Sequence, residues 1–115
     1  MQSVLTLPWP PRVNHYWVAS GHRRYISKEG CAFKADVMVA VLKTQCHKFN
    51  DDPVTLTIML NPPNKRRSDI DNRLKALLDS LQSAKVFNDD YQVQKITIER
   101  GPIVKDGSCT VTIEG

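Results

Sequence analysis

Three aspartates lie near a cluster of arginines in this sequence. Asp69 and Asp71 belong to the segment 66–75, Arg-Arg-Ser-Asp-Ile-Asp-Asn-Arg-Leu-Lys, and Asp90 follows further along in an Asp-Asp pair. Neighbouring carboxylates repel one another unless a divalent cation lies between them, and Mg²⁺ prefers such oxygen ligands. Arginines beside them would hold the phosphodiester that metal-assisted hydrolysis cleaves. The residue types therefore indicate a Mg²⁺-dependent nuclease.

Basic residues gather in two places along the chain. The net charge of +4 and the isoelectric point near 9.1 favour a polyanionic partner, although many basic proteins bind no nucleic acid. The distribution says more, because one group directly precedes the acidic pair, where an incoming phosphate would meet it. The two groups are Lys65, Arg66 and Arg67, and Arg12, Arg23 and Arg24. A run of charges can also be no more than a solvated loop.

The spacing of Asp69 and Asp71 constrains the local structure of any metal site. In an extended segment, residues two apart point to the same side, whereas on a helix they diverge by about 200°. A metal site therefore requires Asp69 to lie in a loop or cap and Asp71 in the first helical turn. Ser68 precedes Asp71 at the spacing of a helix capping box, with Asp in place of the usual Glu or Gln.

The acidic residues also have purely structural explanations. Asp71, Lys75 and Asp79 follow one another at intervals of four, a spacing that forms a solvated ladder of ion pairs on one helix face. An Asp at a helix start is stabilised by the helix dipole without any metal. The pair Asp89 and Asp90 could form an ordinary turn before a strand. The sequence is compatible with these explanations and with a metal site.

The elements that position these residues follow from the hydrophobic periodicity. Alternating apolar residues predict strands, with Gly, Pro and Asn-Asp turns between them. In the first strand either Val4 and Thr6 or Leu5 and Leu7 face the core. The turn residues between the last two strands predict a hairpin. The expected strands are 3–7, 24–26, 54–60, 93–100 and 109–113.

Two helices are predicted between the strands. The first runs from about 28 to 48 after an N-cap at Ser27, and the second from 69 or 71 to 83. The residues expected on the buried face of the first helix are Ala32, Ala35, Val39, Leu42 and Cys46. Those expected on the second are Leu74, Leu77, Leu78 and Leu81. The order of elements predicts one small α/β (α+β) domain, spanning 1–115, with a mixed sheet packed against two α-helices.

Composition and length exclude several classes of protein. With 115 residues, 41% hydrophobic and 24% charged, the chain is typical of an ordinary globular domain. It has no apolar run long enough for a membrane span and no signal peptide, so we expect a cytoplasmic protein with no membrane contact. The three cysteines lack metal-binding or disulfide spacing and are expected to be free and at least partly buried. No nucleotide-binding glycine motif is present, so no organic cofactor is expected.

The segments singled out above resemble one known family. The resemblance begins with Leu-Pro-Trp-Pro-Pro at 7–11 and continues through Asp-Ile-Asp-Asn at 69–72. It also includes Asn14, Tyr16, Lys75, Asp79, Phe87, the Asp89-Asp90 pair and Val93. Over nearly its whole length the chain is similar to RusA-type Holliday junction resolvases, endodeoxyribonucleases of bacteria and their phages. It departs from the family pattern at Ser68, where an arginine is usual.

The resemblance implies an activity and a set of site residues. The catalytic carboxylates fall on Asp69, Asp71 and Asp90, which would bind Mg²⁺ or, as a substitute, Mn²⁺. A catalytic basic residue falls on Lys75. Family members are homodimers that bind four-way DNA junctions and resolve them by paired symmetric nicks during recombination and repair. The basic run and the resemblance together predict DNA contacts at Asn14, Lys65, Arg66, Arg67, Asn72 and Arg73.

Two other functions remain compatible with the sequence. A catalytically silent DNA-binding module would need the basic residues but not the acids. A metal nuclease could instead act on other branched DNA or on RNA. An Asp→Asn series and a metal titration separate the first alternative from a nuclease, and a comparison of substrates separates the second.

Overall fold

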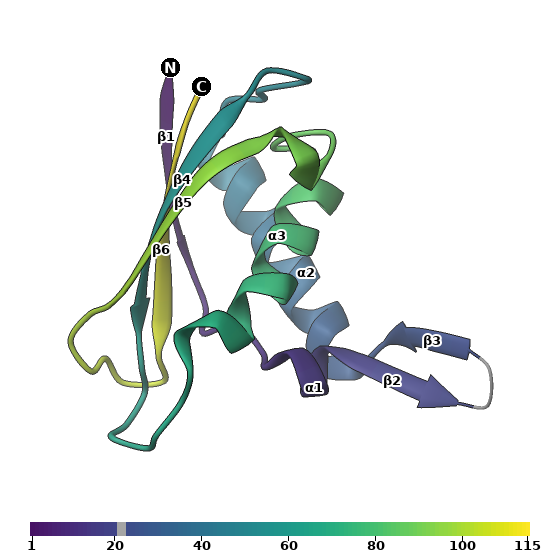
Figure 1. The fold of residues 1–115 in the computed structure, drawn as a ribbon, viewed down its shortest axis with the longest axis vertical. Helices are drawn as coiled ribbons and strands as arrows, with labels where there is room; N and C mark the ends of the chain where they lie inside the picture. Colours follow the sequence, from purple (N-terminus) through teal and green to yellow (C-terminus); the bar gives the residue numbers. More distant parts are fainter. Residues whose placement is uncertain (21–22) are drawn as a thin grey trace.

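A four-stranded mixed sheet forms one layer of the protein, and helices α2 and α3 cover one of its faces (Figure 1). The computed structural model describes residues 1–20 and 23–115, and their side chains except those of 14, 15, 17, 18, 20, 23 and 24. The sheet consists of β1 (Gln2–Leu7), β4 (Val54–Asn61), β5 (Val93–Arg100) and β6 (Ser108–Glu114). The helices that cover it are α2 (Lys28–Thr44) and α3 (Leu74–Ser83). This arrangement confirms the predicted α+β class.

The strand order β1-β6-β4-β5 places the last strand inside the sheet. β6 pairs antiparallel with both β1 and β4, whereas β5 pairs parallel with β4. The predicted hairpin of β5 and β6 is therefore wrong, although the strands themselves are confirmed. β6 can take the inner position because its three apolar residues are fully buried, whereas the apolar residues of β5 are only half-buried and suit an edge. These are Cys109, Val111 and Ile113 on β6, and Ile96 and Ile98 on β5.

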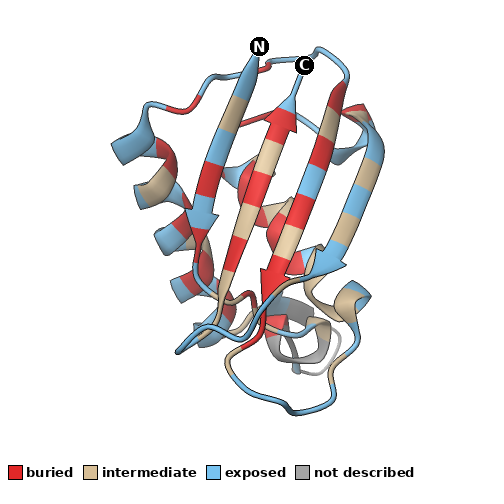
Figure 2. Ribbon diagram, turned by 90° about the vertical axis from the view of Figure 1, so that its left-hand side faces the viewer, coloured by how far each residue is buried: buried red, intermediate tan, exposed pale blue. Residues whose placement is uncertain are grey.

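Buried residues alternate with more exposed ones along β1, β4 and β6, and the buried residues of these strands belong to the core (Figure 2). In β1 the buried pair is Leu5 and Leu7, whereas Val4 is 53% exposed, which decides between the two alternatives for this strand. In β4 the predicted alternation is confirmed, with every second residue buried: Val54, Leu56, Ile58 and Leu60. Each Å² of apolar surface removed from water stabilises the fold by about 25 cal/mol, so the buried row is the main contribution of β4 to stability.

Helix α2 begins as predicted but buries a different face. Ser27 caps it, accepting a hydrogen bond from the Gly30 amide at 3.0 Å, and the helix ends at Thr44 rather than 48. The helical residues predicted to be buried are exposed: Ala32, Ala35, Val39 and Leu42. The buried side chains are Phe33, Val37 and Val41, and Cys46 is buried only beyond the helix end. The prediction was wrong because α2 carries apolar residues on two faces, and Phe33 determines which face fits the sheet.

The second predicted helix is divided into two parts. A 3₁₀ turn, η1 (Ile70–Arg73), leads directly into α3. Leu77 and Leu81 are buried as expected, and Leu74 and Leu78 pack half-buried against the core. The predicted capping box does not form. The residue before η1 is Asp69, and no side chain caps the turn.

A short helix and a two-stranded ribbon were not predicted as such. Helix α1 (Val13–Tyr16) leads into β2 (Trp17–Ser20), which pairs antiparallel with β3 (Arg23–Ile26). Only the β3 part was expected from sequence. The ribbon projects from the body of the protein beside α1 (Figure 1). Residues 21 and 22 lie outside the described residues.

Two further expectations concern membranes and cysteines. None of the helices in the described residues combines the length and the apolar character that crossing a membrane requires. The three cysteines are free, and Cys46 and Cys109 are buried. Cys31 is exposed, contrary to the expectation of partial burial, because it lies on the outer side of the first turn of α2.

The corrected face of α2 generates a stability prediction. Val37 is fully buried and Val39 is 47% exposed, so Val37→Ala and Val39→Ala delete the same atoms at different depths of one helix. We expect Val37→Ala to lower the free energy of unfolding by about 2 kcal/mol. Val39→Ala should change it by less than about 0.5 kcal/mol. Urea denaturation measures both, and the change in helix propensity is the same in each. Equal destabilisation would contradict the assignment of the buried face.

Candidate functional site

Three loops meet at one end of the sheet, where the parallel strands β1, β4 and β5 have their carboxyl ends. They are 8–12, 62–69 and 101–107. The Val104 amide donates to the Pro62 carbonyl at 3.0 Å, which joins two of the loops. Gly107 has a φ of +74°, and a Cβ on it would be 2.7 Å from the Trp9 side chain. This close approach joins the 101–107 loop to the third loop, 8–12. Carboxyl ends of parallel strands are where open α/β sheets bind ligands.

The loop 62–69 delivers Asp69 to this end in an extended conformation. Arg100, the last residue of β5, donates a hydrogen bond to the Ser68 carbonyl and so ties the loop to the sheet edge. Asp69 follows with φ −84° and ψ 134°, and Asp71 lies inside η1. Both side chains are exposed. This is the arrangement that a metal site requires, with the first aspartate before the helical turn and the second inside it.

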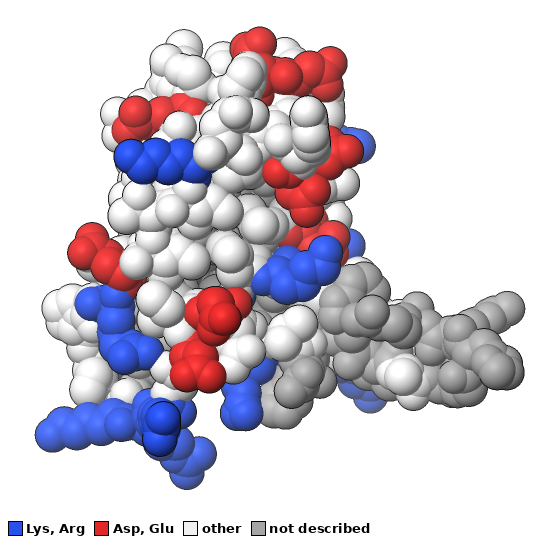
Figure 3. Space-filling model, in the orientation of Figure 1, with Lys and Arg blue, Asp and Glu red and all other residues white. Residues whose placement is uncertain are grey.

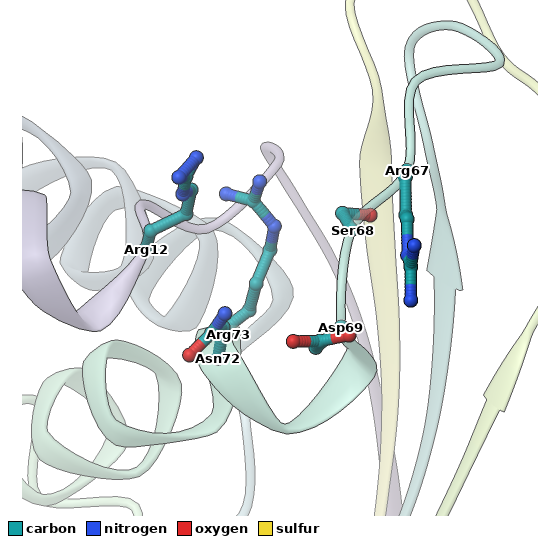
Figure 4. A pocket seen from close by; sticks show the side chains of 6 residues that line it. All are labelled: Arg12, Arg67, Ser68, Asp69, Asn72 and Arg73. Atoms are coloured by element: carbon teal, nitrogen blue, oxygen red, sulfur yellow. The ribbon is translucent and has the colours of Figure 1, made fainter.

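A pocket of about 330 Å³ lies between the loop and the segment after β1 (Figure 4). Asp69 points across it toward Asn72 and Arg73, and Arg12 extends over it from the other side. Its lining residues are Arg12, Arg67, Ser68, Asp69, Asn72 and Arg73. A smaller adjoining pocket of about 190 Å³ shares Arg12, Arg67 and Arg73 and adds Arg66. Several guanidinium groups and one predicted metal ligand therefore face the same space.

Arg73 ties this pocket to the proline-rich segment. Its guanidinium carbon lies 4.4 Å from the centre of the Trp9 ring, a cation–π contact, and it donates to the Pro10 carbonyl at 2.5 Å. Burial, and to a lesser extent the nearby charge of Arg12, lower the pKa of Arg73. The aromatic face and the carbonyl dipole stabilise a cation that is partly removed from water.

Asp79 does not extend the predicted ladder from Asp71 and Lys75. It accepts a hydrogen bond from the Tyr16 hydroxyl and lies 3.9 Å from Lys34 of α2. Burial, together with this contact to Asp79, raises the pKa of Tyr16 far above its ordinary value. The contact fastens α1 to α3. Lys75 is exposed on the first turn of α3 and forms no ion pair within the described part of the chain.

Asp89 and Asp90 have different environments. The Asp89 side chain accepts from the Tyr91 amide, and Gln92 completes a capping box for the 3₁₀ turn η2 (Asp90–Gln92). The turn explanation is therefore confirmed for Asp89. The Asp90 amide donates to Gln82, at the far end of α3 from Asp71. Its side chain is exposed.

Within one chain the structure does not bring Asp90 to Asp69 and Asp71. Asp90 precedes β5, which starts beside Val54, whereas Asp69 follows β4. The length of α3, about 15 Å for ten helical residues, separates the two positions. Accordingly, no group of three or more His, Cys, Asp or Glu among the described residues could hold a metal ion. Asp69 and Asp71 nevertheless suit a hard cation, since Mg²⁺ is often bound by one or two carboxylates with water and substrate phosphate.

The predicted DNA-binding residues fall into three groups. Lys65, Arg66 and Arg67 are exposed on the 62–69 loop. Lys and Arg side chains gather at this end of the molecule, with acidic side chains directly above them (Figure 3). Asn72 and Arg73 line the pocket. Asn14 lies in α1, but its side chain is outside the described residues.

Two residues that line the pocket are not among the site residues predicted from sequence, Ser68 and the cation Arg12. In sequence it belongs to a basic group with Arg23 and Arg24, far from Asp69. The structure places it against the other arginines because the β1 loop and the β4 loop end side by side. Only its position directly after the double proline hinted at a fixed backbone.

Comparison with known proteins identifies relatives of this fold and site. Residues 8–114 match the family model described as "Endodeoxyribonuclease RusA". A crossover junction endodeoxyribonuclease of Enterobacteria phage HK97 is 36% identical over 107 residues, covering 93% of this chain and 89% of the relative. The RusA crossover junction endodeoxyribonucleases of Shigella sonnei and Escherichia coli K12 are 35% and 34% identical over 109 residues, covering 95% of this chain and 91% of each relative.

Exposed carboxylates lie beside an arginine-lined pocket at the carboxyl ends of the parallel strands, an arrangement that suits a phosphodiester substrate. The chain belongs to the RusA family of endodeoxyribonucleases. Nucleases of this kind are generally metal-dependent, and resolvases of this family act on junction DNA.

The contacts of Arg73 generate a prediction about the site's framework. We expect Arg73→Ala to lower the free energy of unfolding by about 1–3 kcal/mol, because the Pro10 carbonyl loses a charged donor and Trp9 loses its cation. Arg73→Lys should lose less, since an ammonium group retains the charge over the ring. Urea denaturation measures the loss. Arg66→Ala is the matched control because Arg66 is exposed. If Arg73→Ala and Arg66→Ala have the same stability, the Arg73 contacts do not support the fold.

Proposed function

We propose that this chain is a Holliday junction resolvase, an endodeoxyribonuclease that cuts four-way DNA junctions by paired symmetric nicks during recombination and repair. The observation that carries the proposal is the presence of Asp69 and Asp71 beside the arginine pocket, in a chain matched to RusA over residues 8–114. The relatives are themselves named crossover junction endodeoxyribonucleases.

Mg²⁺ is the proposed cofactor, with Mn²⁺ as a substitute. Asp69 and Asp71 would hold it, with Asp90 as the third carboxylate. When bound, the ion lowers the pKa of a water molecule and neutralises charge that develops on the attacked phosphate. The two aspartates fit this role because they are exposed, lie on either side of the start of η1 and form no ion pair within the described residues.

The other site residues would bind and orient the DNA. Lys75 lies one turn after Asp71, and its exposed ammonium can neutralise the scissile phosphate or orient the attacking water. The loop cations and the pocket residues Asn72 and Arg73 would contact neighbouring phosphates, with Asn14 beside them on α1. These contacts are charged, so junction binding should weaken as salt rises. The loop cations are Lys65, Arg66 and Arg67.

A homodimer would complete the site. Asp90 lies at the opposite end of the sheet from Asp69 and Asp71, so the third carboxylate has to come from a second copy. A two-fold dimer would have two such composite sites. Two sites related in this way match the two symmetric cuts that resolving a junction requires. The exposed position of Asp90 on η2 leaves it accessible to a partner subunit.

The function is tested by substrate choice. We expect the protein to nick a mobile four-way junction symmetrically with Mg²⁺, and to cut a linear duplex and a replication fork far more slowly. EDTA should abolish cleavage while leaving junction binding intact. Equal cutting of all three DNAs would identify a nuclease with another substrate. Binding without cutting under any divalent metal would identify a silent DNA-binding module.

The carboxylates are tested by isosteric substitution. Asp71→Asn should slow junction cleavage by at least about a hundredfold, because a ligand and its charge are lost at the reacting phosphate. Junction binding in EDTA should be retained or strengthened, since a negative charge near DNA has been removed. Asp106→Asn is the control, because Asp106 is exposed in the β5–β6 loop with φ 66°, a conformation that Asn tolerates. Wild-type cleavage by Asp71→Asn would refute the assignment.

The dimer is tested by mixing two inactive variants. Asp71→Asn and Asp90→Asn should each be inactive alone. If Asp90 completes the partner's site, a mixed dimer contains one site with both carboxylates intact and one with neither. An equal mixture should therefore nick junctions at about a quarter of the wild-type rate, because half the dimers are mixed and each has one working site. No recovery in a mixture that sedimentation shows to exchange subunits would contradict the composite site.

A further inference from the structure

Two guanidinium groups from separate segments face one pocket without a carboxylate partner. Arg12 and Arg73 both line the 330 Å³ pocket, and neither forms an ion pair within residues 1–20 and 23–115. Their guanidinium groups lie beside each other at the pocket (Figure 4). Holding like charges together costs free energy, and an anion between them would remove that cost.

Both arginines are held on rigid backbone. Arg73 is fixed by the Trp9 ring and the Pro10 carbonyl. Arg12 directly follows two prolines, whose φ angles are fixed, and its own carbonyl accepts from the Tyr16 amide at 2.9 Å. The Arg12 side chain is nevertheless exposed. The Arg73 side chain and the Arg12 backbone are therefore positioned before any ligand arrives, which reduces the entropy lost on binding.

The opposite wall adds further donors. Arg67 and Ser68 come from the 62–69 loop, and Asn72 comes from η1. Guanidinium groups bind phosphate oxygens with two parallel hydrogen bonds, which a lysine ammonium cannot do. The described wall residues contain one acid, Asp69, whose carboxylate lies toward the η1 side of the pocket (Figure 4). An anion in the pocket would thus lie between Asp69 and the guanidinium groups of Arg12 and Arg73.

We propose that this pocket binds one phosphodiester of the DNA backbone, next to the phosphate that is cut, and that Arg12 is its binding residue. The subsite rests on the proposed function for the identity of its ligand as DNA. The phosphate in the pocket is not the scissile one, because Asp71 does not line the pocket and the scissile phosphate has to reach both aspartates. Arg12 thereby fixes the position of the strand relative to Asp69 and Asp71.

A double-perturbation experiment tests the subsite. Junctions are made with a single uncharged methylphosphonate at each successive position around the cut, and binding is measured by fluorescence anisotropy in EDTA. At one position the wild-type protein should lose affinity about tenfold, the value of one charge-assisted hydrogen bond. Arg12→Ala should bind the unmodified junction about tenfold more weakly and should lose nothing further at that position.

Lys95→Ala is the matched control. Lys95 is an exposed cation on β5 that pairs with Thr55, at the end of the sheet opposite the pocket. This variant should retain the full wild-type loss at the same methylphosphonate. The salt slope of log affinity should also fall by about one unit in Arg12→Ala and stay unchanged in Lys95→Ala. Equal methylphosphonate losses in wild type and Arg12→Ala at every position would overturn the subsite.

Inorganic phosphate serves as a second probe, because a pocket of this chemistry can also take a free anion. Phosphate should displace the junction from the wild-type protein more effectively than from Arg12→Ala at equal ionic strength. Displacement of this kind without any Arg12-dependent methylphosphonate position would overturn the assignment to DNA. All these measurements are made without metal, so they remain informative if the protein binds junctions but cuts none, which would refute only the proposed function.

Discussion

The pairing of β6 with both β1 and β4 is the constraint on which the rest of the structure depends. It holds two parallel strands at a fixed separation, so that the loops leaving their carboxyl ends face each other across the end of β6. The buried residues of β6 secure it to the helices at the same time. Because an open sheet binds ligands at such an end, the position of the pocket is a consequence of strand order and not of any single side chain.

The Arg73–Trp9 contact holds a positive charge at this end of the sheet. A guanidinium group that is partly buried would normally require a carboxylate, but here an aromatic face and a carbonyl stabilise it. Arg73 therefore keeps its positive charge beside Arg12 and leaves Asp69 free of an ion pair in the described structure. Free carboxylates suit a divalent cation, and free guanidinium groups suit phosphate.

The separation of Asp90 from the other two aspartates follows from the parallel pairing of β4 and β5. A residue that follows β4 and one that precedes β5 have to lie at opposite ends of these strands, joined by α3. The parallel pairing of β4 with the edge strand β5 therefore prevents one chain from bringing Asp69, Asp71 and Asp90 together. Catalysis would then require a dimer, because the strand order keeps Asp90 apart from Asp69 and Asp71 within one chain.

Local sequence left open whether the second helix begins at Asp69 or at Asp71. It was enough to predict the four strands of the main sheet and the start of α2 after Ser27, because periodicity, caps and turn residues decide these. It also determined the family, since the motifs at 7–11 and 69–72 are short and local. Tertiary structure alone decided the rest. α2 has two apolar faces, and packing of Phe33 against the sheet chose between them. Turn residues favoured a hairpin, yet β6 gained more by burial between two strands. Arg12 reaches Arg73 through strand order, which no local pattern encodes.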